Sequence, residues 1–184
     1  MLKSFRKKVA QFLAIVGLLL SVNVLAGEAD APASPSLHVD VADVVARGNV
    51  ESVDGVTSSG QPDQAVLEVF SDSGYAAIID LRGASEKRGI DEKAAVENLG
   101  MDYVLFPIES RAAINFENAA ELDKLIESYD APVLIHCGSG NRVGAMLALR
   151  QSLKGADDDA ALEYGKEGGL TGLEGVVRIR LDEN

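Results

Sequence analysis

The stretch VLIHCGSGNRVG, from Val133 to Gly144, joins a short apolar run to a glycine-rich turn and holds the only cysteine of the chain. A short apolar run bounded by turn residues is typical of a buried strand. Here the run ends in His136 and Cys137, and a helical pattern begins at Arg142. The stretch therefore predicts a strand, a tight turn and a helix, with Cys137 at the carboxyl end of the strand.

Alternating strand and helix patterns surround this stretch. Strands separated by helices favour an α/β fold with a mainly parallel central sheet flanked by helices on both faces. Ligands of such sheets bind beyond the carboxyl ends of the strands, which is where Cys137 lies. The expected strands are 53–60, 75–80, 101–108 and 133–137, and the expected helices are 62–73, 91–100, 115–129, 142–154, one that begins at Asp157 or Asp158, and 173–181.

The first 26 residues have the pattern of a secretory signal peptide. Four basic residues precede an apolar run over 9–24, and Val24-Leu25-Ala26 is a small-residue cleavage site. We therefore expect a signal peptide at 1–26, a flexible Ala/Pro/Ser-rich linker at 27–36 and a single domain at 37–184. The expected location is periplasmic or secreted, with no stable membrane association after cleavage. The alternative is an uncleaved N-terminal anchor.

Charge and residue counts exclude several classes of partner. The chain has 29 acidic and 17 basic residues and a formal net charge of −12. Four of the basic residues lie in the first 26, so the remainder would carry about −16, which repels nucleic acid and anionic membranes. One cysteine cannot form an internal disulfide, and two histidines and one cysteine predict neither a metal site nor a cofactor.

The turn after Cys137 has the composition of an anion-binding loop. Gly138 and Gly140 allow the backbone to curl so that successive N–H groups point inward, towards the N-terminus of the next helix. Arg142 adds a planar fork that matches a tetrahedral oxyanion. The same features stabilise a thiolate, which can attack a bound phosphate. The alternative is a buried thiol that acts as a small hydrophobic side chain.

Four stretches, in order, resemble motifs of cysteine-dependent protein phosphatases of the dual-specificity-like family. HCGSGNR (136–142) resembles their phosphate-binding loop, and SSGQP (58–62), IIDLRGASE (78–86) and MDYVLFPIE (101–109) resemble three further motifs. The combination is similar to the bacterial phosphatase-like domain that is found fused to β-lactamase-like hydrolases. The resemblance implies a dual-specificity-phosphatase-like fold and hydrolysis of a phosphorylated small molecule or protein through a cysteinyl-phosphate intermediate.

The resemblance also implies roles for individual residues. Cys137 would be the nucleophile, Arg142 would hold the phosphoryl oxygens, and Glu109 would be the general acid. His136 would brace the loop through hydrogen bonds. The implied substrate-binding residues are Gly138, Ser139, Gly140, Asn141 and Arg142.

One departure keeps other functions open. Four residues separate Cys137 from Arg142, whereas the phosphatase loop usually has five. The shorter spacing is also that of rhodanese-type sulfurtransferases, which carry sulfur on their cysteine. A third possibility is a non-catalytic module that binds phosphate or sulfate. Val143 also stands where many phosphatases have Ser or Thr after the arginine.

Several charged residues outside the loop have structural expectations. Asp80 and Arg82 are expected to form an ion pair at the end of the sheet, with Glu86 as a further partner. Arg111 is expected to be a surface charge rather than a substrate contact. His38 is isolated in the sequence and has no expected role.

Overall fold

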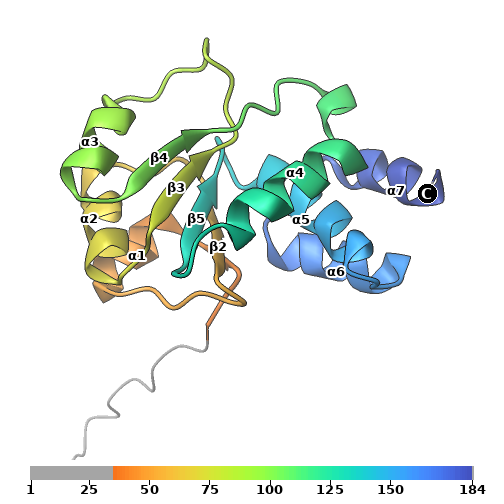
Figure 1. Ribbon diagram of the computed structural model, residues 1–184, viewed down its shortest axis with the longest axis horizontal. Coiled ribbons are helices and arrows are strands. Elements are labelled where there is room, and N and C mark those ends of the chain that lie inside the picture. The colour runs from red at the N-terminus through yellow and green to blue at the C-terminus, as the bar shows by residue number, and fades with distance from the viewer. Residues whose placement is uncertain (1–34, 184) are drawn as a thin grey trace, which may run out of the picture. The chain divides into compact units, whose positions relative to one another are not determined.

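The computed structural model describes residues 35–183, so the expected signal peptide and residues 27–34 of the expected linker lie outside the described residues. A five-stranded parallel sheet forms the centre, in the order β1-β2-β5-β3-β4 (Figure 1). The strands are β1 (His38–Val39), β2 (Val56–Ser59), β3 (Ala77–Asp80), β4 (Asp102–Leu105) and β5 (Val133–His136).

Helices cover both faces of the sheet, as the sequence predicts. Figure 1 shows α1 (Val41–Arg47), α2 (Gln64–Asp72) and α3 (Glu92–Asn98) on one side. On the other side lie α4 (Phe116–Glu127), α5 (Asn141–Leu153), α6 (Asp158–Glu167) and α7 (Glu174–Asp182). A 3-10 helix, η1 (Arg111–Ala113), precedes α4.

Alternate residues of the buried strands pack into two separate cores. Ile78 and Leu134 pack into the core beneath the first group of helices, whereas Ile79 and Ile135 pack beneath the second. Side chains of a strand point alternately to opposite faces, so a strand covered on both faces must be apolar throughout. This explains why 75–80 and 133–136 read as continuous apolar runs.

Side-chain caps begin the helices where the sequence predicts them. The side chain of Asn115 accepts a hydrogen bond from the Asn118 N–H at the start of α4, and that of Asp157 accepts one from the Ala160 N–H at the start of α6. Each cap satisfies a backbone donor that the first turn of a helix leaves unpaired.

The parallel register brings three strand ends together. In the sheet, His136 of β5 pairs with Ser59 of β2 on one side and with Asp80 of β3 on the other. Cys137 directly follows His136. It therefore lies at the carboxyl end of the central strand, which has a neighbouring strand on each side. This edge of the sheet, beyond the carboxyl ends, holds the candidate site.

The sequence did not predict the first strand and helix, and the structure gives His38 a place that the sequence did not indicate. β1 has only two residues and is defined by its pairing with β2, so no periodicity signals it. In β1, the His38 Nδ1 lies 3.1 Å from Ser58 Oγ. His38 also packs against the backbone of Gly140 in the cysteine loop, which corrects the expectation of an isolated residue.

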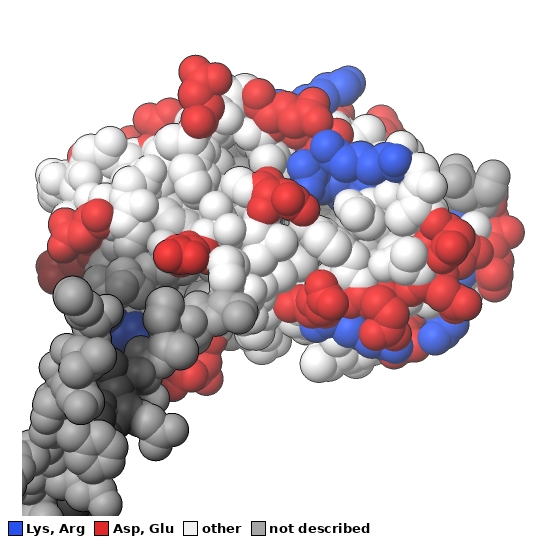
Figure 2. Space-filling model, turned by 90° about the horizontal axis from the view of Figure 1, so that it is seen from below, with Lys and Arg blue, Asp and Glu red and all other residues white. Residues whose placement is uncertain are grey.

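The surface has mixed charge, with acidic residues in excess. Figure 2 shows carboxylates scattered over the face seen from below, with lysines and arginines in small groups beside them. Where this face is formed by described residues, it shows no extended basic surface of the kind that binds nucleic acid. Among residues 35–183, no helix has the length and hydropathy that crossing a membrane requires.

Helix α5 packs unusually close to α6, and glycines make this possible. A Cβ on Gly144 would lie 2.7 Å from Leu170 Cα and still closer to Leu170 N and Gly165 O. These are backbone atoms, which cannot move aside as a side chain can. Gly175, in the exposed part of α7, has open space where its Cβ would be.

We expect Gly144→Ala to lower the free energy of unfolding by about 3 kcal/mol, because it overpacks a backbone contact. Gly175→Ala is the matched control, and it should raise the free energy of unfolding by roughly 0.5–1 kcal/mol through the better helix propensity of alanine. Urea unfolding monitored by circular dichroism measures both. Equal effects of the two variants would contradict the close α5–α6 contact.

Candidate active site

Cys137 lines a pocket of about 380 Å³ at the carboxyl edge of the sheet. Its side chain is 1% exposed, so it lies at the bottom of the pocket rather than at the rim. The pocket brings together residues from the cysteine loop, the β3–α3 connection, the β4–α4 connection and the start of α7. Its lining residues are Glu86, Ile108, Glu109, Ser110, Arg111, Ile114, Cys137, Gly138, Ser139, Asn141, Arg142 and Leu173.

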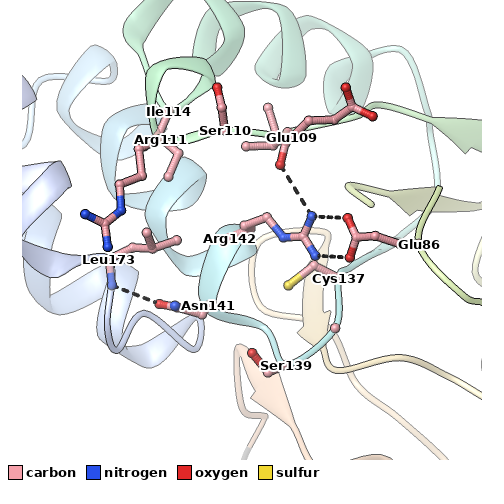
Figure 3. A pocket seen from close by; sticks show the side chains of 12 residues that line it. Glu86, Glu109, Ser110, Arg111, Ile114, Cys137, Ser139, Asn141, Arg142 and Leu173 are labelled. Carbon is pink, nitrogen blue, oxygen red and sulfur yellow. Dashed lines mark hydrogen bonds and ion pairs between the residues drawn. The ribbon is translucent and has the colours of Figure 1, made fainter. Parts of the chain in front are cut away.

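Arg142 is fixed by a bidentate ion pair with Glu86. Its Nη1 donates to Glu86 Oε1 at 2.6 Å and its Nη2 donates to Glu86 Oε2 at 2.7 Å (Figure 3). Nη1 also lies 3.4 Å from the carbonyl oxygens of Leu81 and Ile108. The side chain of Arg142 is 21% exposed, so part of it remains open to a ligand.

This ion pair stays charged over a wide pH range. The hydrogen bonds from Arg142 lower the pKa of Glu86 to about 2, against a smaller opposing effect of burial. The Glu86 carboxylate in turn raises the pKa of Arg142, and the Cys137 sulfur adds to this effect. The sequence predicted Glu86 as a partner of Arg82, and this is wrong: the carboxylate of Glu86 pairs with Arg142, on the pocket side.

A buried cluster of charges lies directly beneath the loop. The guanidinium of Arg82 is 1% exposed and contacts two carboxylates, Asp80 through Nε at 2.8 Å and Glu92 through Nη2. His136 Nε2 lies 2.6 Å from Glu92 Oε1. The expected ion pair between Asp80 and Arg82 is confirmed, and Glu92 is the further partner that the sequence analysis missed.

The arginines keep Asp80 ionised although it is buried. Burial alone would raise the pKa of Asp80, but hydrogen bonds from Arg82, the nearby His136 and the Tyr103 hydroxyl outweigh it and lower the pKa to about 2. Arg88 also donates to Asp80, from Nε to Oδ2 at 3.0 Å. A buried carboxylate remains charged only with this density of partners.

Ligand-type atoms of Asp80, Glu92 and His136 lie within 4.8 Å of one another, which is close enough for a metal ion. Two guanidinium groups already balance the two carboxylates, because Arg82 bonds to both and Arg88 bonds to Asp80. A cation bound here would lie against this guanidinium. The residues therefore fit an ion-paired structural cluster better than a metal site.

Glu109 lines the pocket, but its carboxylate is turned away from Cys137. Figure 3 shows the side chain pointing away from the sulfur. A Cβ built on Gly83 would lie 3.0 Å from Glu109 Cδ, which places the carboxylate over the β3–α3 connection. Glu109 is exposed, so a change of rotamer would meet little resistance from packing.

The cysteine loop is held from both sides. Gly140 has a φ of 80°, and a Cβ there would lie 2.8 Å from His38 Nδ1, so both its conformation and its surroundings require glycine. On the opposite side, Asn141 Oδ1 accepts hydrogen bonds from the N–H groups of Thr171 at 2.8 Å and Leu173 at 3.3 Å. The side-chain oxygen of Asn141 is thus used to anchor the start of α7 to the loop.

The structure brings most of the expected site residues into one place. Cys137, Gly138, Ser139, Asn141 and Arg142 all line the pocket. Gly140 and His136 are buried behind it. The expected hydrogen bonds from His136 to the loop are not present among the described residues: its Nε2 lies next to the Glu92 carboxylate, and its Nδ1 has no partner there.

Six further lining residues were not expected at the site: Glu86, Ile108, Ser110, Arg111, Ile114 and Leu173. Glu86 and Ile108 lie within the quoted motifs, and Ser110 and Arg111 directly follow Glu109 in the sequence. Arg111 was expected to be a surface charge, whereas the structure places it in the pocket wall.

Residues 44–169 match the family model described as a dual-specificity-type phosphatase fused to NAD+ kinase. A β-lactamase hydrolase-like protein of Xylella fastidiosa strain Temecula1 is 32% identical over 101 residues. That match covers 53% of this chain and 23% of the Xylella protein, so this chain corresponds to only about a quarter of that relative.

Solved structures share the fold. A candidate phosphatase from Neisseria meningitidis Z2491 superposes with a TM-score of 0.60 and 25% identity, over 70% of this chain and 92% of the other. A candidate phosphatase from Shewanella putrefaciens CN-32 gives a TM-score of 0.55 and 22% identity, over 72% of this chain and 85% of the other. These similarities confirm the dual-specificity-phosphatase-like fold that the sequence motifs implied.

We expect Asp80→Asn to lower the free energy of unfolding at pH 7 by about 3 kcal/mol, because it leaves Arg88 without its buried counter-charge and Arg82 with Glu92 alone. The pKa of Asp80 is lower in the folded state than in the unfolded state. Its contribution, about 2 kcal/mol, is therefore complete above pH 4 and is lost as the pH falls towards 2. Between pH 4 and 2, the free energy of unfolding of Asp80→Asn should therefore fall less than that of the wild type.

Urea unfolding at pH values from 7 to 2 measures this difference, since urea does not screen charges. Asp72→Asn, at an exposed position in the last turn of α2, is the matched control and should follow the wild type. If Asp80→Asn and the wild type lost stability in parallel between pH 4 and 2, the ion-paired state of Asp80 would be contradicted.

Proposed function

Because the chain belongs to the family of dual-specificity-type phosphatases described as fused to NAD+ kinase, we propose that it hydrolyses phosphomonoesters with Cys137 as the nucleophile. The observation that carries this proposal is the position of Cys137 at the bottom of a pocket beside Arg142, whose guanidinium Glu86 holds with two hydrogen bonds. A thiolate, a fixed guanidinium and a helix N-terminus at one point form a site for attack on a bound phosphoryl group.

The reaction proceeds in two displacements. The Cys137 thiolate attacks phosphorus, and an S–P bond forms as the P–O bond to the leaving group breaks. The leaving oxygen takes a proton from Glu109, whose exposed side chain turns from Gly83 into the pocket for this step. Water then attacks the phosphorus of the cysteinyl phosphate and gives its proton to the Glu109 carboxylate. The S–P bond breaks, the electron pair returns to sulfur, and inorganic phosphate leaves.

Arg142 stabilises the charge on the phosphoryl oxygens. A guanidinium has five N–H groups. Glu86 accepts two of them, and the carbonyl oxygens of Leu81 and Ile108 lie near a third. The Nε–H and one Nη2–H remain for equatorial oxygens. The backbone N–H groups at the start of α5, which have no partner within the helix, add further donors.

The family match favours this reaction over sulfur transfer. The sulfurtransferase alternative rests on the four-residue spacing between Cys137 and Arg142, which does not by itself distinguish the two chemistries. Both need the thiolate and the anion-binding loop. The products differ, and so the two can be separated by assay.

We expect the purified protein, kept reduced, to release phosphate from 4-nitrophenyl phosphate. Cys137→Ser should lower kcat by at least about 1,000-fold, because it removes the nucleophile. Arg142→Lys should lower kcat/KM by about 100-fold, because an ammonium cannot replace the bidentate fork. Phosphate release is measured directly, with thiosulfate and cyanide in a parallel assay. Thiocyanate formation without phosphate release would replace the proposal by sulfur transfer, and neither product would leave only a binding role.

We expect Glu109→Gln to slow the hydrolysis of phenyl phosphate by about 100-fold, because its leaving group needs a proton. The effect on 2,4-dinitrophenyl phosphate should be much smaller, since that leaving group departs as an anion. Glu121→Gln, at an exposed position of α4, is the matched control. An equal effect of Glu109→Gln on both substrates would show that another group is the acid.

A further inference from the structure

Arg111 differs from every other arginine in the described part of the chain. Residues 35–183 contain eight arginines, and seven of them form an ion pair with a carboxylate within that range. Arg111 has no ion pair and its side chain makes no hydrogen bond to any residue between 35 and 183. In a chain with 29 acidic and 17 basic residues, a carboxylate partner is easy to find, so an unpaired arginine needs an explanation.

The explanation lies in the position of Arg111, which lines the same pocket as Cys137. It is the first residue of η1, and the Ser110 side chain accepts a hydrogen bond from the Ala113 N–H at the start of this turn. Figure 3 shows the guanidinium of Arg111 beside Leu173, on the opposite side of the pocket from the guanidinium of Arg142. The fold thus places two guanidinium groups around one pocket.

Among the described residues that line the pocket, Arg111 is the one cation without a carboxylate partner. Glu86 and Arg142 neutralise each other through their two hydrogen bonds. The Glu109 carboxylate is turned towards Gly83. An anion that enters beside the Cys137–Arg142 pair therefore meets the uncompensated charge of Arg111 on the far wall.

The size and walls of the pocket indicate which part of a substrate reaches Arg111. A volume of about 380 Å³ falls in the range of pockets that hold whole small ligands, and it exceeds what a phosphoryl group alone would fill. The half-buried Leu173 provides apolar surface in the pocket wall, and Ile114 is buried behind this wall. Asn141 fixes Leu173 by accepting its N–H, so this wall keeps its position relative to the loop.

We propose that Arg111 forms a second anion subsite, and that the preferred substrates are phosphomonoesters whose leaving group carries another anionic group, a carboxylate or a second phosphate. The proposal rests on the proposed function, because it places the scissile phosphate on Cys137 and Arg142. The apolar wall contacts the body of the leaving group, and the Arg111 fork binds its anionic end.

Three substrates that share one scaffold test the subsite: phenyl phosphate, 3-carboxyphenyl phosphate and 4-carboxyphenyl phosphate. For the wild type, we expect kcat/KM for the better carboxylated substrate to exceed that for phenyl phosphate at low ionic strength. Arg111→Ala should lower this ratio by about fivefold, and Arg111→Lys should restore part of it, because it keeps the charge without the fork. Benzene-1,3-diyl and benzene-1,4-diyl bisphosphate, each compared with phenyl phosphate, test the preference for a second phosphate in the same way.

Lys124→Ala is the matched control, because it removes one positive charge from an exposed position of α4 that does not line the pocket. It should leave the ratio unchanged. The ratio of two substrates cancels any general loss of folded or active protein in a variant. An unchanged ratio in Arg111→Ala, or an equal fall in Lys124→Ala, would overturn the subsite.

Binding to the Cys137→Ser variant separates this proposal from the proposed function. By titration calorimetry, the carboxylated and bisphosphorylated probes should bind more tightly than phenyl phosphate, and adding Arg111→Ala should remove the difference. Preferential binding by this variant, with no turnover by the wild type, would refute the hydrolase and retain the subsite. Turnover by the wild type without a preference for the second anion would retain the hydrolase and refute the subsite.

Discussion

The buried guanidinium of Arg82 is the group on which the site depends. It bonds to both Asp80 and Glu92, two carboxylates that the fold removes from water, and these in turn lie next to His136 at the end of the central strand. Without the arginine, two buried negative charges would lie next to the strand that presents Cys137. Removal of one member of a buried ion pair commonly costs about 3–5 kcal/mol. The position of the thiol therefore depends on an electrostatic balance beneath it as much as on apolar packing.

The same connection that supplies Arg82 also fixes the second arginine of the site. Between β3 and α3, Arg82 points into the core, and Glu86 reaches the pocket and holds Arg142. Arg88 turns back to Asp80, so the connection is tied to the sheet at both of its ends. One short segment thus couples the buried charges to the group that would bind phosphate. A change in this segment should affect stability and phosphate binding together.

The sequence predicts the layers of this fold well, because apolar runs and helix caps are local signals. The strands around Ile78 and Leu134 and the caps at Asn115 and Asp157 all lie where local patterns place them. Contacts between distant segments are different. Glu86 lies 56 residues from Arg142, and nothing local distinguishes that partner from the nearer Arg82. Arg111 likewise reads as a surface charge until the β4–α4 connection is placed beside the cysteine loop.

In the proposed reaction, Cys137 carries the phosphoryl group during turnover. The most direct measurement is mass spectrometry of peptides from the protein after a rapid quench during hydrolysis of 4-nitrophenyl phosphate. We expect one added phosphoryl group on the wild-type peptide that contains Cys137, and no added group on the same peptide of Cys137→Ser. Turnover of the substrate without this adduct at any quench time would contradict covalent phosphoryl transfer at Cys137.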